Sequence, residues 1–176
     1  MRPPVLLILV ISLFGCSRSY KDLEAAFGVE EMKGSPSLTA TTIVVTGPRH
    51  KGAMNYREIV DVYVSPAGIG IDVGVPFHKP LFLPTDAIAG CSMTCFGTED
   101  QHVDLIVPST GSEISIPSSP LLRDWCWNSR KPMISGALLS EWKYSGATLP
   151  PPAELGQFPD SRDAYDKQAY QTCLGY

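Results

Sequence analysis

The chain has 176 residues and a formal net charge of −4, from 14 Lys and Arg against 18 Asp and Glu. Its basic residues form no cluster, so neither a nucleic acid nor an anionic membrane face is expected as the main partner. The 16 prolines and 15 glycines separate β-branched runs, a pattern that favours one domain of many short strands over a helical bundle.

The N-terminus combines one positive charge with a short apolar run. Arg2 precedes Val5–Phe14, which is apolar except for Ser12. A membrane-spanning helix needs about 20 apolar residues, so this run is too short to be one. The small residue Gly15 then precedes a cysteine. These are the three parts of an export signal over residues 1–15.

The sequence Leu13-Phe14-Gly15-Cys16 resembles the lipobox of bacterial lipoproteins, although Phe14 is larger than usual at its position. The resemblance implies a thioether diacylglycerol on Cys16, cleavage before it, and acylation of the new amino group. Ser17, where an Asp would retain the protein in the inner membrane, implies sorting to the outer membrane. The alternatives are an inner-membrane lipoprotein, or an ordinary secretory signal in which Cys16 is incidental.

Four more cysteines follow Cys16, at positions 91, 95, 126 and 173. An even number in an oxidising periplasm suggests two disulfides, for which four cysteines allow three connectivities. An extended strand would separate the Cα atoms of Cys91 and Cys95 by about 13 Å, beyond the roughly 7 Å limit for a disulfide. We therefore expect these two cysteines to bond to Cys126 and Cys173. A turn starting at Gly90 would instead allow a local Cys91–Cys95 bond.

A short helix is expected within residues 19–32, ended by Gly34-Ser35-Pro36-Ser37. Alternation and turn residues then predict seven strands, at residues 38–46, 57–65, 69–73, 81–83, 86–96, 102–107 and 113–116. Ser65-Pro66-Ala67-Gly68 predicts a turn between two of them. Leu81–Leu83 lies between Pro80 and Pro84, which predicts an edge strand.

Ser119 before Pro120 predicts the start of a helix that runs to Arg130 or Lys131. The helical period places Leu121, Leu122, Trp125 and Cys126 on one side, with Arg123, Trp127 and Arg130 opposite. Trp and Arg dominate binding hot spots, so Trp127, flanked by Arg123 and Arg130, is a candidate partner surface. The alternative, which we favour, is that the segment Met133–Trp142 covers Trp127.

The rest of the chain is rich in proline, with further helices expected around Leu138–Trp142 and at Asp160–Cys173. The predicted organisation has a signal peptide at residues 1–15 and a lipidated tether at 16–37. A β-rich domain with its closing helix follows at 38–131, and a C-terminal extension at 132–176.

Seven antiparallel strands followed by one amphipathic helix resemble the pleckstrin-homology and GRAM-like fold. The resemblance implies a β-rich α+β domain, a bent barrel that the helix closes, with a small β-sandwich as the alternative. The stretch from Asp61 to Ile88 also resembles uncharacterised small bacterial domain families. Neither resemblance specifies a function.

Two motifs of common active sites do not occur. The sequence has no Gly-x-Ser-x-Gly or His-Glu-x-x-His, and the glycines at 68–74 lie in a strand pattern rather than at a helix start. His102 and Asp104 share one strand face, but His50 and His78 lie in separate loops, so we expect a solvated polar face rather than a metal site. No catalytic residue, cofactor or metal ligand is assigned.

The expected function is that of a non-enzymatic periplasmic lipoprotein, held at the membrane by its lipid and serving protein interaction or envelope structure. A small periplasmic hydrolase and a lipid- or small-ligand-binding protein are the alternatives. A polar cleft with converging His and carboxylates would favour the hydrolase, and a large apolar cavity the ligand carrier. A flat exposed patch would favour the interaction module.

Overall fold

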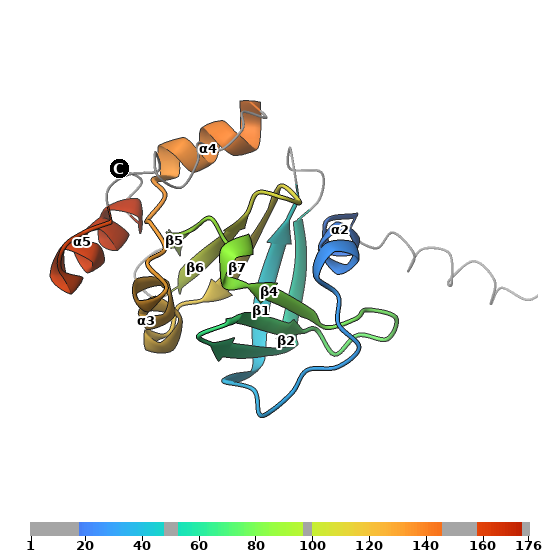
Figure 1. The fold of residues 1–176 in the computed structure, drawn as a ribbon. Coiled ribbons are helices and arrows are strands. Elements are labelled where there is room, and N and C mark those ends of the chain that lie inside the picture. Colours follow the sequence, from blue (N-terminus) through green and yellow to red (C-terminus); the bar gives the residue numbers. More distant parts are fainter. Residues whose placement is uncertain (1–17, 48–52, 97–99, 146–157, 174–176) are drawn as a thin grey trace, which may run out of the picture.

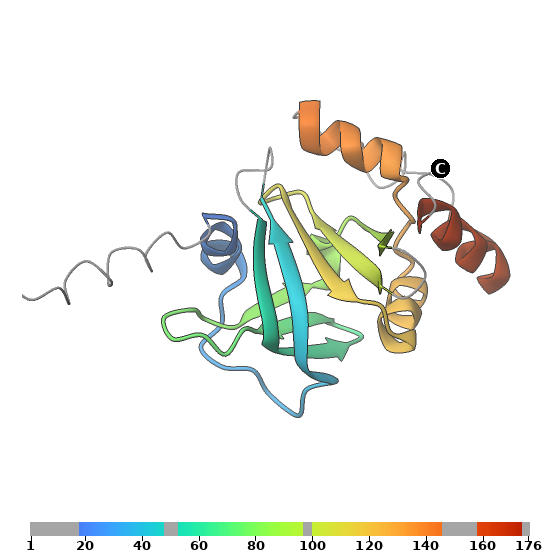
Figure 2. The same ribbon diagram turned by 180° about the vertical axis from the view of Figure 1, so that it is seen from behind.

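One curled antiparallel sheet organises the molecule. The computed structural model describes residues 18–47, 53–96, 100–145 and 158–173, and Figures 1 and 2 show the sheet from two sides as a half-barrel with helices around it. Its strands follow the order β4-β3-β2-β1-β7-β6-β5. They are β1 (Leu38–Thr46), β2 (Ala53–Ser65), β3 (Gly68–Asp72), β4 (Leu81–Pro84), β5 (Gly90–Phe96), β6 (Asp100–Val107) and β7 (Ser112–Pro117).

The predicted fold class, a β-rich α+β domain of seven antiparallel strands, is confirmed. The β-sandwich alternative is wrong, because all seven strands belong to one sheet, with β1 pairing to both β2 and β7. The strand β4 is an edge strand, as its flanking prolines predict. The strand β5 starts at Gly90 rather than at Asp86, because Thr85–Ala87 forms a 3₁₀ turn.

The concave face of the sheet carries the core. Alternate residues of the strands point inward, as the period of two requires, and become fully buried. The residues with no exposed surface include Val60, Val62, Ile69, Ile71, Leu81, Leu83, Val103, Leu105, Ile114 and Ile116. Both halves of the sheet therefore contribute to one cluster, which also includes residues of the helices α2, α3 and α5.

The helix α3 (Pro120–Asn128) follows the last strand and begins where Ser119-Pro120 predicts. The Oγ of Ser119 accepts a hydrogen bond from the backbone N–H of Leu122 at 3.2 Å. The helix ends at Asn128, earlier than predicted, because Arg130 adopts a left-handed φ of 51°. The N–H of Lys131 then donates to the carbonyl of Cys126, which is the Schellman pattern of a helix end.

The N-terminal helix α2 (Arg18–Phe27) lies against the sheet near the β4 edge (Figure 1). It ends before the predicted limit of Met32, and its buried residues Tyr20 and Leu23 belong to the core. Gly28, directly after the helix, forms an antiparallel bridge with Leu81. The part of the expected tether that begins at Arg18 is therefore packed on the domain.

The chain after α3 covers the opposite edge of the sheet. Met133 forms a parallel bridge with Cys91 of β5, and a Cβ on Gly90 would lie 2.8 Å from the carbonyl oxygen of Pro132. This close approach explains why a glycine stands there. The two helices expected in this region are present as α4 (Gly136–Ser145) and α5 (Arg162–Cys173), and Tyr165 and Ala169 of α5 join the core.

Two disulfides fix this arrangement. Cys91 bonds to Cys126 across a Cα–Cα distance of 6.4 Å, and Cys95 bonds to Cys173 across 5.1 Å. The strand β5 is thereby tied to α3 by one bond and to α5 by the other. The Cys91–Cys95 bond is not formed, since Gly90 lies in a strand and does not start a turn.

Replacing both Cys91 and Cys126 by Ala should lower the free energy of unfolding by about 3 kcal/mol, because a bond across 35 residues restricts the unfolded chain. Urea unfolding of the oxidised variant and the oxidised wild type measures the difference. A denaturation midpoint that does not change would contradict the structural role of this bond.

Candidate functional site

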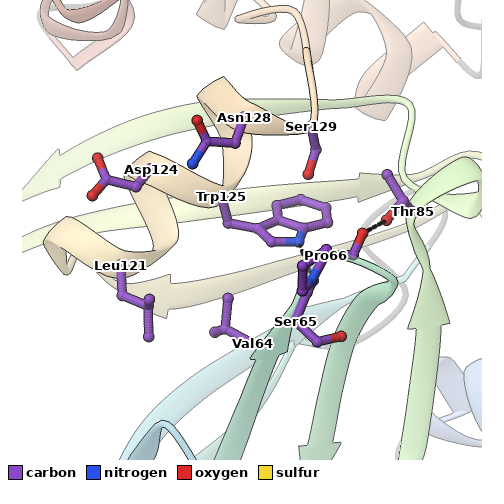
Figure 3. A pocket seen from close by; sticks show the side chains of 9 residues that line it. All are labelled: Val64, Ser65, Pro66, Thr85, Leu121, Asp124, Trp125, Asn128 and Ser129. Atoms are coloured by element: carbon purple, nitrogen blue, oxygen red, sulfur yellow. Dashed lines mark hydrogen bonds between the residues drawn. The ribbon is translucent and has the colours of Figure 1, made fainter.

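A groove lies between α3 and the β2–β3 turn, with a volume of about 310 Å³ (Figure 3). Figure 3 shows the indole of Trp125 reaching from the helix toward Pro66, between the two walls. The residues that line the groove are Val64, Ser65, Pro66, Thr85, Leu121, Asp124, Trp125, Asn128 and Ser129. The groove is thus formed by the end of β2, the turn that follows it, and a helix from a distant part of the sequence.

Hydrogen bonds fix the floor and one wall of this groove. The indole N–H of Trp125 donates to the carbonyl of Ser65 at 2.7 Å, which joins α3 to the turn. On the other side, the hydroxyl of Thr85 donates to the carbonyl of Pro66 at 3.0 Å. Because the turn is held from both sides, the groove is formed before any ligand binds.

The groove combines an apolar wall with a polar rim. Leu121 is 42% exposed and, with Val64, provides apolar surface at one end. Asp124 and Asn128 lie about one and two helical turns after Leu121 on α3, and they provide polar groups. Asp124 also accepts a salt bridge at 2.8 Å from the guanidinium of Arg162 in α5.

Asp124 is the one titratable side chain among the nine lining residues. The group within hydrogen-bond reach of its carboxylate is the guanidinium of Arg162, which stays protonated and cannot serve as a general base. A single exposed carboxylate beside apolar surface suits binding of an apolar group next to a cation. The geometry of the groove therefore favours recognition over catalysis.

Trp127, predicted as a candidate partner surface, packs within the chain. Its ring centroid lies 4.9 Å from that of Phe158 and 5.4 Å from that of Tyr165. The guanidinium of Arg130 lies over the Phe158 ring, 4.7 Å from its centroid, in a cation–π arrangement. Trp127 is partly buried, and the rings that pack on it belong to α5 and the segment before it rather than to Met133–Trp142.

The burial of Tyr165 supports this role of α5. Its hydroxyl donates to the carbonyl of Lys131 at 3.0 Å, and burial raises its pKa above the ordinary value. Arg123, also part of the predicted surface, is partly buried on the same helix. No local signal in the sequence predicts Phe158 or Tyr165 as partners of Trp127, because they lie 31 and 38 residues further along the chain (158 − 127 and 165 − 127).

The face of the sheet that carries Asp104 was expected to be solvated, and this expectation is wrong. Asp104 of β6 has no exposed surface, and Glu113 of β7 is 3% exposed on the same face. The hydroxyl of Thr94 donates to the carboxylate of Asp104 at 2.6 Å. Leu139 of α4 packs with Ile106 on this face.

These buried carboxylates do not form an accessible active site. A substrate in solution cannot reach an acid that has no exposed surface. Within the described residues, no three His, Cys, Asp or Glu side chains are placed to hold a metal ion. The hydrolase alternative therefore has no open acid pair to support it at this face.

A second polar cluster joins α2 to the loop between β3 and β4. The ring of His78 lies 4.6 Å from that of Tyr20, and its Nδ1 is 3.5 Å from a carboxylate oxygen of Glu24. Tyr56 completes the cluster, 5.4 Å from Tyr20. Burial is the main cause that raises the pKa of Tyr20 above its ordinary value. The cluster holds the loop on the helix.

Comparisons with known proteins assign no family to the chain. It matches no protein-family model, and no curated protein has significant sequence similarity to it. In the described part of the chain, every helix is too short or too polar to cross a bilayer.

Replacing Trp127 by Ala should lower the free energy of unfolding by about 3 kcal/mol, because the change removes its packing on Phe158 and Tyr165. Leu121→Ala on the exposed side of the same helix is the matched control, with an expected loss below about 1 kcal/mol. Urea unfolding measures both. A Trp127→Ala loss no larger than that of the control would restore Trp127 as a partner-binding residue.

Proposed function

We infer that this chain is a lipid-anchored periplasmic lipoprotein of bacteria whose domain binds a partner protein of the cell envelope through the groove beside α3. The observation that carries the binding role is the preformed groove around Trp125, with its apolar wall and single carboxylate. The lipobox residues Leu13, Gly15 and Cys16 support the anchor. The two disulfides support an oxidising compartment.

The anchor follows from the chemistry that the lipobox implies. A diacylglycerol and an amide-linked acyl chain on Cys16 would each contribute about 0.8 kcal/mol per buried methylene, so together they hold the chain on the membrane. Ser17 supports the periplasmic face of the outer membrane, with the inner membrane as the alternative. The folded domain itself needs no membrane-spanning helix for this location.

The ligand of the groove is best matched by a short segment of an envelope protein. A volume of about 310 Å³ has room for a few side chains, at the lower end of ligand-site sizes. An apolar side chain would contact Leu121 and Val64, and a following Lys or Arg would approach Asp124. The competing role of a carrier for lipids has less support, because core side chains fill the concave face of the sheet.

Replacing Cys16 by Ser should abolish acylation and release the protein from the detergent phase of membrane extracts, because the thioether needs the sulfur. Mass spectrometry of the N-terminal peptide and labelling with a radioactive fatty acid measure the change. Recovery of a wild-type N-terminus that carries no acyl group would contradict the anchor.

The partner role is tested in membranes with a photoreactive residue at position 121. A protein crosslinked there is then purified, and its affinity is measured for the wild type, for Leu121→Asp and for the control Tyr170→Asp, which alters an exposed residue of α5. We expect Leu121→Asp to weaken binding at least about tenfold, because it removes the apolar contact and places a charged group where the ligand would bury an apolar side chain. Equal affinities for all three proteins would contradict binding in the groove.

A further inference from the structure

The loop between β3 and β4 exposes an aromatic side chain almost completely. Phe77, at its tip, is 98% exposed, against 42% to 59% for the other exposed large hydrophobic residues among those described. Its φ is 72°, in the left-handed region that disfavours residues with a bulky side chain. Neither the exposure nor the backbone conformation of Phe77 helps the domain to fold, so the domain alone does not explain this residue.

The loop is nevertheless held in a defined position. The side chain of His78 is 7% exposed and packs on Tyr20. The carbonyl of Lys79 accepts a hydrogen bond from the hydroxyl of Tyr20 at 3.0 Å, and Lys79 forms an ion pair with Glu30. Because the residues directly after Phe77 are fixed to α2 and the segment that follows it, Phe77 projects beside this helix.

The same helix lies next to the expected lipid. Arg18, the first residue of α2, is two residues after Cys16. Two residues span at most about 7 Å in any conformation, so acyl groups on Cys16 would hold the start of α2 close to the lipid headgroups. Tyr20, which contacts His78, is in the first turn of this helix. The β3–β4 loop and α2 lie at the same side of the molecule in both views (Figures 1 and 2).

We propose that Phe77 inserts into the lipid bilayer as a second, non-covalent contact of this lipoprotein with its membrane. This inference rests on the proposed acylation of Cys16. One aromatic side chain is too small to hold a protein on a membrane, but tethering makes the contact intramolecular and raises its effective concentration. The exposed neighbour Pro76 extends the apolar surface that approaches the lipid.

A bilayer contact at this loop would also orient the domain. In both views α3 lies at the side of the sheet away from α2, so the groove would face away from the lipid (Figures 1 and 2). A lipid anchor at a single position does not by itself set the orientation of the domain. The Phe77 contact would supply a second fixed point and leave the groove accessible to a protein in the periplasm.

The test uses the full acylated chain in vesicles of phosphatidylethanolamine and phosphatidylglycerol, with benzoylphenylalanine at position 77. The matched control carries the same residue at position 170, where Tyr170 is 59% exposed on α5. After irradiation, mass spectrometry identifies the adducts and the N-terminal peptide. We expect lipid adducts at position 77 to exceed those at position 170 about tenfold, because a photoreactive side chain that inserts into the bilayer contacts the acyl chains.

Each other outcome overturns a defined part of the proposal. Equal or absent lipid adducts at position 77, together with an acylated N-terminal peptide, would refute the membrane contact of the loop alone. Adducts between two copies of the chain would refute it in favour of self-association. An N-terminal peptide without acyl groups would refute the proposed anchor, and the Phe77 contact with it.

A second variant separates membrane contact from folding. Phe77→Asn should fold at least as well as the wild type, because Asn tolerates the left-handed region better than Phe. When the acylated variant is bound to vesicles, amine-specific labelling of Lys79 should be several-fold higher than in the vesicle-bound wild type, because the loop no longer contacts the headgroups. Unchanged labelling in vesicles, with an unchanged melting temperature, would refute the contact.

Discussion

A sheet that curls without closing leaves two edge strands, and the rest of this structure depends on how these edges are covered. An uncovered edge exposes unpaired N–H and C=O groups that can pair with another chain. The edge at β4 is met by the segment after α2, through the bridge between Gly28 and Leu81. The edge at β5 is met by Met133, and it is tied to α3 and α5 by the two disulfides. The two ends of the chain thus complete the domain at opposite edges.

The helix α3 connects these features to the groove. Cys126 bonds it to β5, while Trp125, one residue earlier, bonds it to the β2–β3 turn through the carbonyl of Ser65. Successive residues of a helix point about 100° apart, so one short helix can contact two halves of a curled sheet. Trp127 points to a third side of the helix, where Tyr165 of α5 packs on its ring. The position of the groove is therefore a consequence of how the half-barrel is held together.

The sequence predicts the elements of the fold better than their contacts. Strand alternation, the Ser119-Pro120 start of α3 and the prolines around β4 are local signals, and the structure confirms all three. The burial of Asp104 and the packing of Phe158 on Trp127 depend on chain segments that fold back from far along the sequence. The groove was not predicted for the same reason, since no single stretch of the chain contains both of its walls. Alternation shows which residues share a face, but not what covers that face.

The bond between Cys95 and Cys173 has a consequence for the biogenesis of the protein. Its two cysteines are 78 residues apart, so the bond cannot form until the chain has been made as far as α5. Until then the thiol of Cys95 lacks its native partner, while Cys91 and Cys126 are already present and able to pair with it. Formation of this bond is therefore a late step in the folding of the domain, and exchange of wrongly paired disulfides would assist it.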